Sequence, residues 1–221
     1  MNRLRLFQQY DAKKVFKTAC ERYDLVYFGH VSQHHDEHHI VRGFTLSPHH
    51  VDRHYCVGTV AQKDIILLER SDTISSPDKP SKQYTWLIIK TDLVAHSPSH
   101  IVLNGHEYDT ITYDYLRIKY HTHHHFEPHQ LQGYDPEFLK QFRVYAPPHE
   151  IDRLFYLIPG ETASVLGHHF SKFDFEIIGD ELIAYLPTDK PTLANVEDLL
   201  KASLWLADEI NNRITSATSA S

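Results

Sequence analysis

The chain has 221 residues and carries a formal net charge of −7 when its histidines are neutral. Hydrophobic residues make up 41% and charged residues 23%, which is ordinary usage for a globular protein with its own core. Sequence-independent binding to nucleic acid needs a positive field. The acidic balance and the scattered lysines and arginines therefore argue against a nucleic-acid partner.

Localisation and redox state are predicted from what the sequence lacks. No apolar run approaches the roughly 20 residues of a membrane-spanning helix, and no signal-peptide pattern is visible at the N-terminus. We therefore expect no membrane span and a cytoplasmic protein. Cys20 and Cys56 lie in apolar contexts, so we expect two separate buried thiols in a reducing compartment.

The first two-thirds of the chain are dominated by strand patterns. A helix is predicted after Asp11, which is a good N-cap, with Val15, Phe16, Ala19 and Cys20 on one face. Residues 71–81 contain prolines, serines and aspartates and predict an exposed loop. Residues 109–120 fit a strand or a helix, and we favour the helix. Strands are predicted at 25–31, 39–46, 55–60, 64–69, 84–90 and 100–103.

The last third is richer in helix signals. Asp135 followed by Pro136 is a typical helix start, and Gly179-Asp180 separates two apolar runs as a hairpin turn would. Thr192 caps a final helix that we expect to reach about Ile214. Helices are also predicted at 150–156 and 161–170, and strands at 142–145, 173–178 and 181–186.

These elements predict an α+β fold, with a largely antiparallel sheet and a helix-rich C-terminal third. That third includes a strand hairpin and the long closing helix. The length suits a single domain, or two intimate subdomains at about 1–130 and 131–214. Residues 215–221 are small and polar, so we expect a flexible tail.

One segment resembles a bacterial family of domains of unknown function. It reads Asp135-Pro136-Glu137-Phe138, then Phe142-Arg143-Val144-Tyr145, then Glu150, Arg153, Leu157 and Pro159. In that family a Phe-x-Val-Tyr strand precedes an Arg-containing helix that ends in Pro. Ile151 and Ile158 depart from the family pattern. The resemblance implies a shared fold but no activity, because none is assigned to the family.

Histidine is the unusual feature of the composition, with 19 copies. The first cluster runs from His34 through His35, Asp36, Glu37 and His38 to His39. The spacing His34-x-x-Glu37-His38 matches an inverted zincin pattern, which requires a helix. The neighbouring residues predict a loop leading into a strand, so a protease is not favoured. His34, His35, Glu37 and His38 remain candidate metal ligands.

A second cluster occupies residues 121–125. If this segment is extended, His121, His123 and His125 share one face, and neutral imidazoles placed in this way can bind zinc. The alternative is a solvated histidine-rich loop with only opportunistic affinity for metal.

Two functions are compatible with these patterns. The first is a non-enzymatic binding or interaction domain for a protein or small-molecule partner, since no nucleophile elbow, phosphate-binding glycine loop or calcium loop is present. The second is a metal-binding protein or metal-dependent hydrolase that uses the histidine clusters with zinc. Convergence of both clusters, or of one cluster with Asp36, Glu37 or Glu107, would favour the second function.

Overall fold

A computed structural model describes residues 11–31, 40–45, 47–76, 79–94, 99–105, 108 and 110–219 of the chain. In this part of the chain the strands form one nine-stranded sheet in the order β1-β2-β3-β4-β9-β8-β5-β7-β6. Every pair of neighbouring strands is antiparallel. The predicted α+β class is confirmed.

The strands differ greatly in length, and the central hairpin is the longest unit. Their bounds are β1 Val26–Gly29, β2 Val51–Val60, β3 Lys63–Ser76, β4 Lys79–Asp92, β5 His100–Asn104, β6 His124–Phe126, β7 Arg143–Ala146, β8 Asp174–Ile178 and β9 Glu181–Pro187.

The helices lie before, between and after these strands. They are α1 Ala12–Tyr23, α2 Thr110–Lys119, α3 Pro136–Gln141, α4 Ile151–Leu157, α5 Gly160–His169 and α6 Leu193–Ser219, with short 3-10 turns at Pro128–Gln130 and Pro148–Glu150. The helix signals at Asp11 and Asp135 are confirmed, because each carboxylate accepts a backbone N–H of the first turn. Thr192 caps α6 by accepting from the Asn195 N–H at 3.2 Å.

The sheet joins distant parts of the sequence. Strands β1 to β4 form a meander, and β9 then pairs with β4 from Trp86↔Pro187 to Asp92↔Glu181. The β8–β9 hairpin turns at Gly179, whose φ of 63° favours glycine, as the sequence predicts. Strands from both sides of residue 130 therefore share one sheet.

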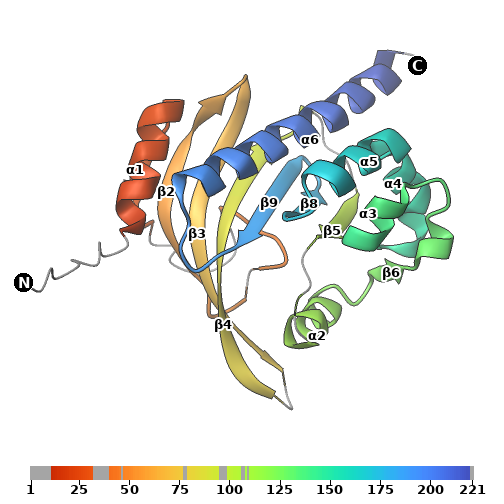
Figure 1. Cartoon of the computed structure of the whole chain (residues 1–221), viewed down its shortest axis with the longest axis horizontal. Coiled ribbons are helices and arrows are strands. Elements are labelled where there is room, and N and C mark those ends of the chain that lie inside the picture. Colours follow the sequence, from red (N-terminus) through yellow and green to blue (C-terminus); the bar gives the residue numbers. More distant parts are fainter. Residues whose placement is uncertain are drawn as a thin grey trace, which may run out of the picture.

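One face of the sheet carries the larger apolar core. Figure 1 shows α6 running across this face, with α1 beside one end and α3, α4 and α5 gathered at the other. Phe16 of α1, Phe138 of α3 and Leu199 of α6 are fully buried against it. These helices bury the apolar side of nearly every strand.

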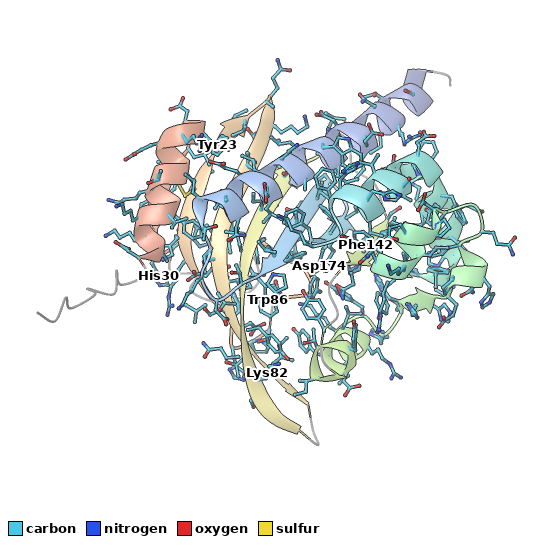
Figure 2. The ribbon with its side chains drawn as sticks, in the orientation of Figure 1. Tyr23, His30, Lys82, Trp86, Phe142 and Asp174 are labelled. Carbon is cyan, nitrogen blue, oxygen red and sulfur yellow. A yellow bond between two sulfur atoms is a disulfide. The ribbon has the colours of Figure 1, made fainter. Side chains whose placement is uncertain are left out.

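The opposite face has a smaller core in which apolar and polar groups mix. Phe44 from the segment 40–45 and Leu116 from α2 pack there with Trp86 and Tyr185 of the sheet. In Figure 2 Trp86 and Asp174 lie in the interior, whereas Lys82 lies on the part of the β3–β4 hairpin that projects beyond the sheet.

Three predictions about local structure are wrong. Of the predicted loop 71–81, residues 71–76 and 79–81 are strand instead, because β3 continues to Ser76 and β4 begins at Lys79. Residues 40–45 are not a strand. The final helix continues to Ser219, beyond the predicted end near Ile214.

The prediction of two separate thiols is also wrong. Cys20 of α1 and Cys56 of β2 are both buried as expected, but they form a disulfide that ties the first helix to the sheet. Within the described residues, no helix combines the length and apolarity needed to cross a membrane. The cytoplasmic location stays a prediction.

Candidate functional site

A buried ion pair anchors the face of the sheet that α2 covers. Arg70 is fully buried, and its Nε and Nη2 donate to the two carboxylate oxygens of Asp52, each at 2.7 Å. Nη2 also donates to the Val41 carbonyl at 2.7 Å, and Nη1 to the Arg42 carbonyl at 3.2 Å. The guanidinium therefore supplies hydrogen bonds that a neighbouring strand would otherwise give to the segment 40–45.

Glu176 of β8 is a second buried charge on this face. Its Oε1 accepts from Tyr120 Oη at 2.5 Å and from His100 Nε2 at 2.7 Å. Its Oε2 accepts from Tyr185 Oη at 2.7 Å and from the Phe44 N–H at 2.8 Å. Burial opposes the ionisation of Glu176, but the hydrogen bonds from His100 and the tyrosines outweigh it and lower its pKa.

These bonds fix the C-terminal end of α2. Tyr120 follows the helix directly, and Lys119 donates to the Gly43 carbonyl at 2.6 Å. Burial lowers the pKa of Lys119 to about 8, although Glu176 opposes this shift. The helix is therefore attached by its last turn both to β8 and to the segment 40–45.

A surface pocket of about 620 Å³ opens between α2 and the strands β6 and β7. Helix α2 contributes Tyr113, Leu116 and Arg117, and Tyr120 follows at its end. The strands and the turn that leads into them contribute the rest of the lining: His121, His123, His124, His125, Glu127, Arg143 and Tyr145.

The register of the sheet places the polar groups of this wall. His125 pairs with Tyr145, and Tyr145 pairs with Val102 of β5. Asn104 pairs with Arg143 two residues further along β5 and β7. Because alternate residues of a strand share a face, Arg143 and Tyr145 both point towards α2, where the Arg143 guanidinium lies 4.5 Å from the centre of the Tyr113 ring.

The pocket has more cationic than anionic groups. Arg117 and Arg143 are both exposed, and neither forms an ion pair with a carboxylate of the described residues. Among the described residues of the lining, Glu127 supplies the one carboxylate, and its Oε1 lies 3.3 Å from His125 Nδ1 instead of beside an arginine. The arginines are therefore available to an anion, with aromatic faces next to them.

His123 is the most constrained imidazole of the pocket. Its Nε2 lies 3.1 Å from the His100 carbonyl oxygen, and its ring stacks on Tyr120 with 4.9 Å between the ring centres. Burial, helped by the nearby His100, lowers the pKa of His123 to about 4. This side chain is therefore neutral at pH 7 and serves as part of the wall.

The structure brings the members of the second histidine cluster to one pocket but not to one metal-binding arrangement. His121 is exposed in the turn after α2, and of the three only His125 lies in β6. Nowhere in the described ranges do three His, Cys, Asp or Glu side chains form a group that could hold a metal ion. Zinc binding by His121, His123 and His125 stays a prediction.

The first histidine cluster lies outside the described residues. His34, His35, Asp36, Glu37, His38 and His39 all fall in 32–39, and Glu107 falls in 106–107.

Sequence reasoning missed both arginines of the pocket. In the sequence, Arg143 stands in a strand motif, and Arg117 falls in the ambiguous segment 109–120. Once α2 was predicted as a helix, Tyr113, Arg117 and Tyr120 were recognisable as neighbours at spacings of four and three residues. Nothing in the sequence indicates that Arg143 lies opposite them, because that depends on the strand order.

Comparisons with known proteins support the fold alone. No family model matches the chain, and no curated protein matches it in sequence. Among solved structures, the crystal structure of the mycobacterial trehalose monomycolate transport factor A, TtfA, matches with a TM-score of 0.58 and 8% sequence identity. The match covers 91% of this chain and 93% of that chain, so this protein has the fold of TtfA over nearly its whole length.

Proposed function

We propose that this protein is a non-enzymatic binding domain that holds an anionic ligand in the pocket between α2, β6 and β7. The observation that carries the proposal is the pair Arg117 and Arg143, which line the pocket without a carboxylate partner among the described residues. Guanidinium groups bind phosphate and carboxylate through paired hydrogen bonds. The tyrosines beside them offer flat faces for the remainder of such a ligand.

The rigid support of the pocket favours binding over a purely structural role for these residues. Tyr120 and Lys119 attach the end of α2 to Glu176 and Gly43, and Arg143 lies within the sheet. A pocket whose walls are fixed before the ligand arrives loses less entropy on binding. The likeness to a transport factor fits an accessory binding role, although it shows the fold alone.

The proposal predicts that the two arginines control affinity for anions. Inorganic pyrophosphate and citrate are the probes, and isothermal titration calorimetry is the measurement. Arg143→Gln and Arg117→Gln should each weaken binding about 10-fold, because a hydrogen bond to a charged group contributes about 1.5–3 kcal/mol.

Arg53→Gln is the matched control. It removes the same charge from an exposed position on β2, outside the pocket, and should leave the affinity unchanged. If all three variants bind both anions as the wild type does, or if the wild type binds neither at millimolar concentration, the proposed function is wrong.

A further inference from the structure

The pocket between α2, β6 and β7 is called the anion pocket below. A second, smaller pocket of about 270 Å³ adjoins it. The two pockets share His125, Glu127 and Arg143. Phe126, Leu131 and Phe142 give the smaller pocket an apolar wall of buried side chains. A ligand whose anionic group is held by Arg143 can therefore extend a few bonds further along this wall into the smaller pocket.

Asn104 is the unusual member of the second pocket. Its side chain is 1% exposed, yet neither the amide nitrogen nor the amide oxygen has a hydrogen-bond partner among the described residues. Buried polar side chains in folded proteins are nearly always paired. Asn104 lies opposite Arg143 in the register of β5 and β7, so an unpaired donor and an unpaired acceptor lie next to the pocket's guanidinium.

We propose that the second pocket is a subsite for an amide group on the anionic ligand. This inference rests on the proposed anion binding and adds to it the chemical class of the ligand: an anionic group with a secondary amide a few bonds away. A carboxamide side chain offers one acceptor and one fork of donors, and a secondary amide presents the complementary N–H and C=O. Because Asn104 is only 1% exposed, the side chains around it shield these hydrogen bonds from water.

Two kinds of molecule present this chemistry. The free C-terminus of a peptide has a carboxylate next to its last amide, and an N-acylated sugar phosphate has a phosphate and an acetamido group on one ring. Matched probes separate these sources. N-acetylglycine is compared with 4-oxopentanoate, which has a methylene group in place of the N–H, and N-acetylglucosamine 1-phosphate is compared with glucose 1-phosphate.

The test is a titration of the full-length ¹⁵N-labelled protein followed by NMR, with the side-chain NH₂ signal of Asn104 as the direct readout. At least one amide-bearing probe should bind about 5-fold or more tightly than its partner without the amide, because a site built for a hydrogen bond rejects the analogue that lacks it. The NH₂ signal should move only with the amide-bearing probe. The pair that shows the preference identifies the source.

Two variants separate this inference from the proposed function. Asn104→Leu keeps the size of the side chain and should abolish the preference within the pair while the amide-free anion still binds. Arg143→Gln should weaken both members of a pair.

Equal binding of both members of each pair to the wild type, with Arg143→Gln weakening all of them, would overturn the amide subsite and leave anion binding intact. Asn104 would then be hydrated by a buried water. If no anion binds, pyrophosphate included, the proposed function and the subsite are both wrong.

Discussion

Glu176 and Asn104 are two buried polar side chains with very different surroundings. Glu176 accepts hydrogen bonds from His100, Tyr120 and Tyr185 and from a backbone N–H. Asn104 has none among the described residues. A satisfied buried carboxylate stabilises the fold around it, whereas an unsatisfied amide costs about 1–3 kcal/mol. An unpaired amide at Asn104 lowers the stability of the folded protein, which is consistent with the proposed role of this side chain in binding.

Replacing Asn104 by leucine should therefore stabilise the protein without ligand. We expect the free energy of unfolding of Asn104→Leu to rise by about 1 kcal/mol, because an unpaired amide is exchanged for an apolar group of similar shape. Urea unfolding measures the change.

Asn211→Leu is the control for this prediction. Asn211 is also buried, but its Oδ1 accepts from the Val94 N–H at 2.9 Å, so this variant should lose stability. A loss of similar size in both variants would show that the Asn104 amide is paired in solution.

The elements that the sequence predicted well are those whose signals are local. Asp11, Asp135 and Thr192 mark helix starts by a cap next to a periodic apolar face, and Gly179 marks the hairpin by its backbone conformation. Such signals act within a few residues and do not depend on the rest of the fold.

The elements that the sequence did not predict depend on distant partners. Residues 40–45 are apolar enough for a strand, but the Arg70 side chain takes the carbonyls of Val41 and Arg42. Residues 71–81 have the composition of a loop, yet ladder pairs such as Thr73↔Gln83 and Asp72↔Tyr84 keep both strands extended. The pocket could not be predicted from the sequence for the same reason, because Arg143 lies beside α2 only as a result of the strand order.

Helix α6 is held against the sheet by one apolar face. Leu200 is buried beneath the helix, whereas Leu204, one turn later, is only partly buried. Leu200→Ala should lower the free energy of unfolding by about 2–5 kcal/mol, through lost transfer energy and a cavity. Leu204→Ala should lower it by about 1 kcal/mol or less. Equal midpoints in chemical denaturation for both variants and the wild type would show that α6 does not contribute to the core.

At the scale of the whole molecule, two half-buried histidines couple stability to pH. Burial lowers the pKa of His54, and it lowers that of His123 to about 4. Below about pH 6.5 these two side chains therefore bind more protons in the unfolded chain than in the folded protein, and for His123 this continues to about pH 4, so their contribution to stability falls as the pH drops.

His123→Gln should reduce this pH dependence. We expect the stability difference between pH 7.5 and pH 5 to shrink by about 1 kcal/mol, well below the full effect of the shift because the His123 ring is partly exposed. His121→Gln, in the same turn but exposed, should leave the difference unchanged. The measurement is urea unfolding at the two pH values, and an unchanged slope in His123→Gln would mean that this ring titrates alike in the folded and unfolded chain.

The strand order has a consequence for the chain as it leaves the ribosome. Strand β4 ends at Asp92, but β9, its neighbour on the far side, begins only at Glu181. The meander from β1 to β4 can therefore assemble while Trp86, Leu87 and Ile88 still lie on an open edge. An uncovered apolar edge is prone to pair with other chains. Nascent protein that has completed β4 but not yet β9 is thus the species that needs protection from aggregation.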